Sequence, residues 1–427
     1  MFEAICIRRK QNYLSPIFDE PIDVGFLAEA LLFYQKVYLI ADQGMLKALI
    51  LKSQPDVLLS FLESGFLEIF YLENNTGVYT EDSGTPYERH LPTLFSIPDY
   101  AWQKHAPKLF SEAIGCSVKG GRRYSKQFSK YVKPLSFDDS VRFETLEDIS
   151  NGNYIRDAVA HFLKYQAPEY QLPNPLIFNI DRVEIANYSD RFAVETNIDF
   201  GKANKSYHKH ISPKHSSLSV AYLLSNLIEA RGNWHFSSRF SSEVATDPVS
   251  SVIFSLKFND LLAARKNSEE QISAFQDFIF DDARSISEVI NSGERDFNDL
   301  WKLISEAAKF KHWLKDQQPN KQLVKEYFRE VTKASWVDRL PSKSMRWTIF
   351  NAAGLAIDAL GAGGIGKVLG LAVSAGDQFL LDKLLKGWKP NQFIDESLKK
   401  FVAVKNRAQP NNSLNRTRNE AVFHSQS

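Results

Sequence analysis

Cysteine is scarce in this sequence, and its positive and negative charges almost cancel. Only Cys6 and Cys116 are present, and two cysteines form neither a disulfide framework nor a cysteine-based zinc site. The formal net charge of +1 gives no global attraction to nucleic acid or anionic lipid, so any such attraction must come from a local cluster. The N-terminal MFEAICIRRKQ has its apolar run before its charges, the reverse of a secretory signal. We therefore expect a cytoplasmic protein.

Recognisable catalytic motifs are lacking as well. The chain contains no G-x-S-x-G elbow, no H-E-x-x-H helix, no Gly-rich dinucleotide turn and no nuclease carboxylate cluster that ends in Glu-x-Lys. Catalytic triads assemble from distant positions, so an unrecognised hydrolase or nuclease stays open as one hypothesis. The sequence favours a non-enzymatic protein without a cofactor.

Large apolar side chains, by contrast, are plentiful. Aromatic residues make up 13% of the 427 residues, which is enough to build real cores. A chain of this length exceeds one ordinary core, so at least two domains are expected. Strand and helix patterns are mixed in the first half and helical patterns follow, which predicts an α+β fold.

The first half of the sequence alternates strand and helix patterns. An amphipathic helix is expected through Val24 to Leu32, and two short helices end before Gly65. FLEIFYL and VYTE, separated by Asn74-Asn75-Thr76-Gly77, indicate a hairpin over 66–81. The other expected elements are strands at 2–7, 36–41, 176–180 and 182–198, with a turn at 187–190, and helices at 98–114 and 152–165.

From about residue 213 the apolar spacing becomes helical. Expected helices cover 217–230, 247–264, 268–290, 296–314 and 321–334. We therefore predict a mixed α/β-strand domain over 1–205 and a mostly α-helical C-terminal domain over 206–405. Residues 406–427 are polar and aperiodic, and we expect them to be a disordered tail because such a composition cannot form a core.

The stretch Gly361-Ala-Gly-Gly-Ile-Gly-Lys367 resembles the Walker A loop of the NB-ARC or STAND signalling ATPases. A phosphate-binding loop needs Ser or Thr after its lysine to hold Mg²⁺, and it follows a buried strand. Here Val368 follows the lysine, and NAAGLAIDAL before the loop has a helical period. The apparent Walker B at 379–382 lies too close for an intervening helix and strand. We therefore expect no nucleotide ligand.

The glycines instead indicate a Gly-rich, apolar helical hairpin over 344–386. Glycine inside a helix costs about 1 kcal/mol relative to alanine, so tight packing must compensate for them. Small residues at every fourth position form a smooth ridge that lets two backbones approach closely. The small residues assigned to this packing or membrane hairpin are Gly354, Ala362, Gly366, Gly370 and Ser374.

The hairpin has alternative roles. From Thr348 to Gly376 its only charges are Asp358 and Lys367, and they interrupt the roughly 20 apolar residues that a membrane span needs. A permanently inserted single helix is therefore not expected. Either the hairpin is buried within the helical domain, or it is sheltered there and released to a membrane or a like partner. A flexible glycine hinge is a further alternative.

A basic and aromatic segment covers 119–133. This composition suits contact with a phosphate backbone and its bases, or with anionic lipid headgroups. Gly120 and Gly121 are expected to make its start a loop. An ordinary solvated surface segment is the alternative. The residues proposed for a phosphate or lipid surface are Lys119, Arg122, Arg123, Tyr124, Lys126, Phe128, Lys130 and Lys133.

Three histidines form a weak candidate metal site. His208, His210 and His215 could supply three imidazoles. No carboxylate or thiol is nearby in the sequence, and the interleaved lysines would repel a cation. We therefore expect an exposed basic linker and no metal.

The leading hypothesis is a non-enzymatic intracellular binding or effector protein that acts on a membrane through its Gly-rich hairpin. Its partner would be another protein or an anionic membrane, and it would lie in the cytoplasm or at the inner face of a membrane. Bacterial defence, such as antiviral defence, or a toxin system is the setting that this hypothesis suggests. The alternative is a nucleic-acid-binding protein that uses the segment 119–133.

Overall fold

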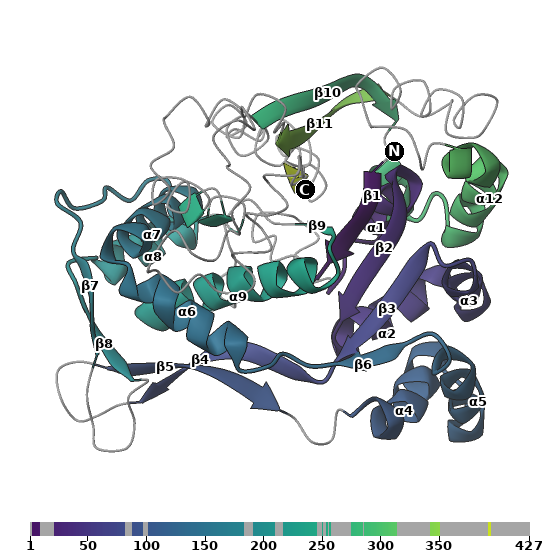
Figure 1. Cartoon of the computed structure of the whole chain (residues 1–427), viewed down its shortest axis with the longest axis horizontal. Helices are drawn as coiled ribbons and strands as arrows, with labels where there is room; N and C mark the ends of the chain where they lie inside the picture. The colour runs from purple at the N-terminus through teal and green to yellow at the C-terminus, as the bar shows by residue number, and fades with distance from the viewer. Residues whose placement is uncertain are drawn as a thin grey trace, which may run out of the picture.

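The computed structural model describes the following residues: 2–8, 21–81, 88–96, 101–182, 191–209, 217–245, 250, 253–254, 256–257, 275–284, 286–313, 342–350 and 392–393. Two sheets and the helices around them make up most of this part of the chain, and the sheets lie toward opposite ends of the molecule (Figure 1). The predicted α+β fold is confirmed.

A parallel five-stranded sheet forms the first centre of the fold. Its strands are β1 (Phe2–Ile7), β2 (Tyr34–Ala41), β3 (Leu67–Leu72), β6 (Lys133–Leu135) and β9 (Glu243–Val244). They lie in the order β6-β3-β2-β1-β9, and every neighbouring pair is parallel. Parallel sheets are usually covered on both faces. This sheet fits the rule, because buried side chains of its strands point to both faces.

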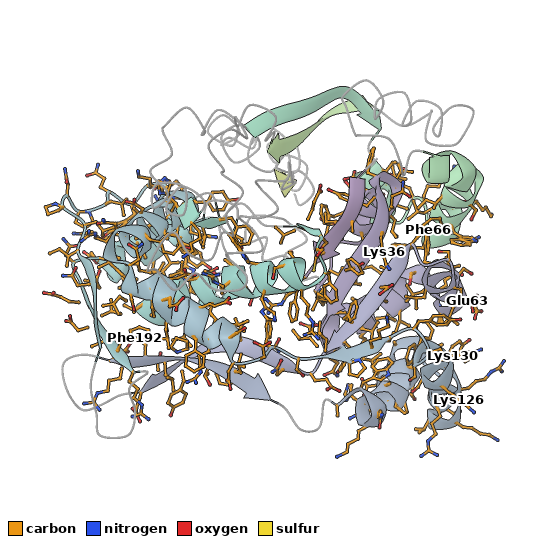
Figure 2. The ribbon with its side chains drawn as sticks, viewed as in Figure 1. Lys36, Glu63, Phe66, Lys126, Lys130 and Phe192 are labelled. Carbon is orange, nitrogen blue, oxygen red and sulfur yellow. The ribbon has the colours of Figure 1, made fainter. Side chains whose placement is uncertain are left out.

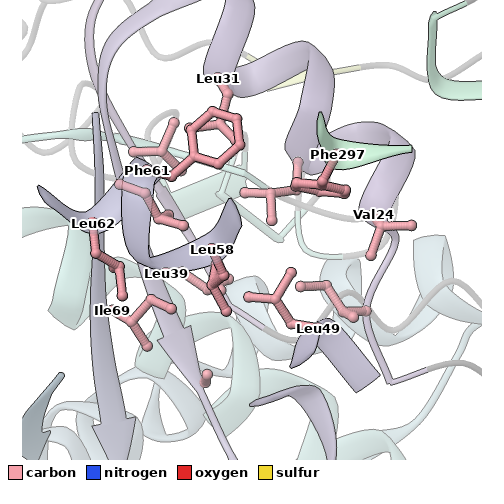
Figure 3. Packing of buried hydrophobic residues seen from close by; sticks show 14 of the residues in the cluster. Val24, Leu31, Leu39, Leu49, Leu58, Phe61, Leu62, Ile69 and Phe297 are labelled. Carbon is pink, nitrogen blue, oxygen red and sulfur yellow. The ribbon is translucent and has the colours of Figure 1, made fainter. Parts of the chain in front are cut away.

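One face of the parallel sheet is covered by helices from both halves of the sequence. Figure 3 shows Leu39 and Ile69 of the sheet packed near Phe61, with Phe297 in the same cluster. Burying each such side chain contributes about 1.5–3 kcal/mol. The helices that supply this cluster are α1 (Val24–Phe33), α2 (Gln43–Ser53), α3 (Pro55–Glu63), α4 (Trp102–Ile114), α5 (Val118–Phe128), α11 (Ile286–Ser292) and α12 (Phe297–Trp313).

The other face of the parallel sheet packs against α6 (Ser140–Ser150) and α9 (Val220–Arg239). Cys6, Ile40 and Leu72 point to this side and share a cluster with residues of α9. Burial raises the pKa of the Cys6 thiol to about 12, so this cysteine is an inert core residue.

A four-stranded antiparallel sheet forms the second centre. Its strands are β4 (Asn74–Glu81), β5 (Arg89–Ser96), β8 (Phe192–Thr196) and β7 (Phe178–Arg182), in that spatial order. Its inner side packs against α7 (Gly152–Gln166), α8 (Phe200–Tyr207) and the first half of α9. The helix α9 runs between the two sheets (Figure 1). Its side chains belong to the clusters of both centres.

The hairpin predicted over 66–81 is wrong. Its first part is β3 of the parallel sheet, whereas its second part is β4, which pairs with β5 in the other sheet. The expected turn at 74–77 lies inside β4. Asn74 does not shape a turn, because its side-chain amide exchanges hydrogen bonds with the backbone N and O of Phe137 at 2.8 and 3.0 Å.

A third sheet lies in the second half of the chain, where helices were predicted, so this part of the prediction is wrong. β10 (Phe275–Arg284) and β11 (Ser342–Phe350) pair in antiparallel fashion, and β12 (Gln392–Phe393) joins β11. Within the helix expected over 268–290, residues 275–284 are therefore a strand, while its end at 286–290 is helical and belongs to α11. The first residues of the expected 344–386 hairpin are a strand as well. Apolar residues alternate at 345, 347 and 349, which is the period of a strand rather than of a helix.

Several expected elements are present at the predicted places. β1, β2, α1, α4, α7 and α12 lie within a few residues of their predicted bounds. The helix α9 begins near its predicted start but continues to Arg239, well beyond the predicted end at 230. The helix at 321–334, the turn at 187–190 and the tail at 406–427 lie outside the described residues. The domain division at residue 205 stays a prediction. Residues from the two sides of this position contact each other, since β9 pairs with β1 and Phe297 packs beside Phe61.

Candidate anion-binding surface

The basic segment folds as the second helix of a tight helix pair. α4 ends at Gly115, whose φ of 66° is the left-handed conformation that glycine adopts readily. The next helix, α5, begins after Ser117, whose side-chain oxygen accepts a hydrogen bond from the backbone N of Gly120 at 3.3 Å. This serine cap satisfies one of the free N–H groups at the helix start.

Gly120 and Gly121 are helical, so the prediction that they form a loop is wrong. The reason is packing. A Cβ on Gly121 would lie 2.2 Å from the carbonyl O of Pro107 and 2.9 Å from the backbone N of Ser111. Glycine is therefore required where α5 crosses α4, and the close approach fixes the rotation of α5 about its axis.

The inward side of α5 carries the aromatic residues of the segment. Phe128 is fully buried, and its ring centroid lies 4.6 Å from that of Phe110. Tyr124 is partly buried and stacks on the same ring at 6.4 Å and 19°. Tyr131, just past the helix, donates a hydrogen bond to Glu63 at 3.4 Å. The aromatic residues expected on a binding surface are therefore part of the core or its edge.

The outward side of α5 carries the cations. Residues 119, 122, 123 and 126 are exposed, and at about 100° per residue they fall within roughly 100° of the helix circumference, opposite the buried side. Lys130 follows one turn later, and Figure 2 shows Lys126 and Lys130 pointing away from the molecule. We call these five residues the α5 cation row: Lys119, Arg122, Arg123, Lys126 and Lys130.

No side chain of the α5 cation row has an ion-pair or hydrogen-bond partner among the residues that the structure describes. Several members are three or four positions apart, so they are neighbours on the helix surface and repel one another. Within the described part of the chain, the row is therefore a local cluster of cations without ion-pair partners, in a protein whose formal net charge is only +1.

Lys133, the last cation of the segment, belongs to a different structure. It lies on β6, and its Nζ is 3.5 Å from Glu68 on β3. Glu68 also pairs with Lys36 of β2 at 2.5 Å. Partial burial raises the pKa of the Glu68 carboxyl, but hydrogen bonds and attraction from the two lysines outweigh it, so the net shift is downward. Lys133 is thus compensated within the sheet.

The other candidate sites are only partly described. His208 contacts Ser217 Oγ through Nε2 at 3.2 Å, while His210 and His215 lie outside the described residues. No group of three or more His, Cys, Asp or Glu that could hold a metal occurs in the described part of the chain. The residues of the predicted glycine ridge, from 354 to 374, are also outside it. Among the helices that are described, none is long and apolar enough to cross a membrane.

A buried charge cluster was missed by the sequence reasoning. Arg231 of α9 is buried, and its Nε and Nη2 lie 2.8 and 2.6 Å from Asp148 Oδ2 on α6. Its Nη1 is 3.5 Å from Glu144, and Lys257 Nζ is 2.7 Å from Asp148 Oδ1. The only local signals are two carboxylates four residues apart and an arginine within an apolar helix. The two cations and the two carboxylates balance in charge, which indicates a structural role.

Comparisons of the chain with protein-family models, with curated proteins and with solved structures found no match. What the protein does must therefore be inferred from its own residues.

Proposed function

We propose that this protein is a non-enzymatic binding protein that attaches to phosphate-bearing, anionic partners through the α5 cation row. The proposal rests on the row itself: four exposed cations on one side of α5 and Lys130 just past its end, without a carboxylate partner in the described residues. Phosphate groups would relieve the repulsion within the row, and they would release counterions as they bind.

The test removes charge from the row without touching its buried side. Arg122, Arg123 and Lys126 are replaced together by glutamine, and binding to DNA, inorganic polyphosphate and phosphatidylserine vesicles is measured at low salt. We expect affinity for at least one of these anions to fall by about ten-fold or more, because three phosphate contacts are lost.

The matched control removes three exposed lysines from other helices: Lys164, Lys205 and Lys302, each to glutamine. It changes the net charge by the same amount and should bind nearly as the wild type does. Equal losses in the two variants would show that only net charge matters. If the wild type binds none of the three anions, the proposal is wrong.

The membrane-effector hypothesis rests on residues outside the described part of the chain, and it stays a prediction together with the cytoplasmic location. Deletion of 344–386 followed by vesicle flotation tests it separately from the α5 cation row.

A further inference from the structure

We infer that the partner of the α5 cation row is the sugar–phosphate backbone of a nucleic-acid duplex, bound without regard to base sequence. The inference rests on the proposed function and specifies which polyanion the row contacts. It follows from the shape of the row, from the burial of its aromatic neighbours and from the residues at its ends.

The row is a line rather than a patch. Positions 119, 123 and 126 follow one another by four and three residues, and position 130 follows by four more. At about 1.5 Å per residue, the line is about 16 Å long. A duplex presents one phosphate per about 1.7 Å of its axis when both strands are counted, so the phosphates along a line of this length outnumber the five cations of the row.

The row offers little to single-stranded nucleic acid. Proteins that bind single strands stack bases on exposed aromatic side chains. Phe128 is fully buried here, and the Tyr124 ring is stacked on Phe110. Exposing either ring would require α5 to leave the core. Contact with phosphates needs no such change.

The helix is also held rigidly, as binding to a regular backbone requires. Gly121 fixes α5 against α4 at its start. Just past its end, Ser129 Oγ donates to the carbonyl O of Ser125 at 2.7 Å and accepts a hydrogen bond from Trp102 Nε1 at 3.0 Å. The backbone of the row is therefore ordered before any ligand binds, which lowers the entropic cost of association.

A membrane surface fits the row less well. A helix that lies on a membrane inserts its apolar side among the lipid headgroups, but the apolar side of α5 is packed in the core, and only Val118 is an exposed large apolar residue of this helix. An exposed carboxylate, Glu63, accepts a hydrogen bond from Tyr131 beside the Lys130 end of the row. A flat anionic surface would approach this carboxylate, whereas a duplex can contact the row without covering it.

The experiment measures how binding depends on salt. The full chain is titrated with a DNA duplex of mixed sequence, a duplex of unrelated sequence and the matching single strand, between about 50 and 200 mM salt. With five contacts, the log–log slope for duplex should be about −4.5, because each phosphate contact contributes about −0.9. The variant with Arg122, Arg123 and Lys126 replaced by glutamine should have a slope that is smaller in magnitude by about 2.7.

Two further measurements separate the alternatives. Replacing Arg122 and Arg123 by lysine keeps the charge, so duplex affinity should stay within about three-fold of the wild type. A larger loss, or different affinities for the two duplexes, would show base reading by guanidinium groups and overturn the inference. Tighter binding to the single strand would overturn it as well.

The proposed function and this inference can fail separately. If phosphatidylserine vesicles or polyphosphate bind in a manner that depends on the row but duplexes do not, the duplex inference is wrong and the proposed function stands. If no anion binds, both are wrong. Both are supported if duplex binding depends on the row and the control variant, in which Lys164, Lys205 and Lys302 are replaced, binds duplex as tightly as the wild type does.

Discussion

Arg231 and the α5 cation row show two opposite ways in which this protein places positive charge. Arg231 is buried and pairs with Asp148 and Glu144. The row is exposed, and no carboxylate pairs with it in the described residues. A buried charge without a partner is too costly to keep, whereas an exposed charge can stay unpaired because water solvates it. The buried, ion-paired arginine therefore serves the fold, and the unpaired row remains available to a ligand.

The largest effect should come from Arg231. Its replacement by methionine leaves Asp148 and Glu144 without their arginine partner in a buried place, and removal of one member of such a cluster costs about 3–5 kcal/mol. Arg122→Met on the exposed side of α5 should change stability by no more than about 0.5 kcal/mol. Urea unfolding of the two variants measures both changes. If the two variants had similar stabilities, burial would not explain the difference between Arg231 and the exposed cations of the row.

His90 sharpens the comparison because it is a buried group that can become positive, and the carboxylate beside it is exposed to solvent. Glu88 lies 3.9 Å away and is exposed, and Thr80 contacts Nδ1 at 3.1 Å. Burial lowers the pKa of His90 from 6.5 to about 4. Since the unfolded state then takes up a proton first, stability should be unaffected above pH 6.5 and should fall as the pH drops from 6.5 to about 4.

The size of this loss is at most about 3 kcal/mol. Urea unfolding of the wild type and of His90→Gln at several pH values isolates the contribution, because other titrating groups affect both proteins. The difference between them should shrink as the pH falls through this range. A constant difference would show that His90 is not held neutral by burial.

A smaller effect is expected at Gly121, which determines the direction in which the row points. Gly121→Ala places a Cβ 2.2 Å from the Pro107 carbonyl O. Crowding of this kind costs about 1–3 kcal/mol, although alanine alone would favour the helix by about 1 kcal/mol. Gly152→Ala at the start of α7 is the matched control, because nothing lies within 4 Å of its Cβ. The melting temperature of Gly121→Ala should therefore be lower than that of the wild type, whereas that of Gly152→Ala should not be.

The sequence predicted individual helices and strands better than it predicted which of them pair or pack together. The strands β1 and β2 and the helices α1, α4 and α9 were readable because their apolar spacing is local. The row at 119, 122, 123, 126 and 130 also has helical spacing, but two adjacent glycines indicated a loop. Only the contact with Pro107, supplied by another helix, shows why glycine is needed inside α5.

Pairing between distant segments could not be read from local patterns. β3 and β4 are nearly adjacent in sequence yet belong to different sheets, and neither strand carries a signal that identifies its neighbour. The same is true of Arg231 and Asp148, which meet across 83 positions. In the candidate surface, composition identified the cations. It did not show which aromatic residues are buried in the core, because that depends on the rotation of α5 about its axis.

The pairing of β9 with β1 also has a consequence for protein synthesis. The ribosome makes β1 before β9, and the strand that pairs with its free edge, at 243–244, emerges more than 200 residues later. Until then Tyr34 also lacks the Glu243 carboxylate that its hydroxyl contacts at 2.6 Å. The α4–α5 pair draws on earlier neighbours such as Lys47, which meets Glu112 at 2.9 Å. Since chains begin to fold from the N-terminus during synthesis, we expect the cation-bearing helix to be in place while the parallel sheet is still open along one side.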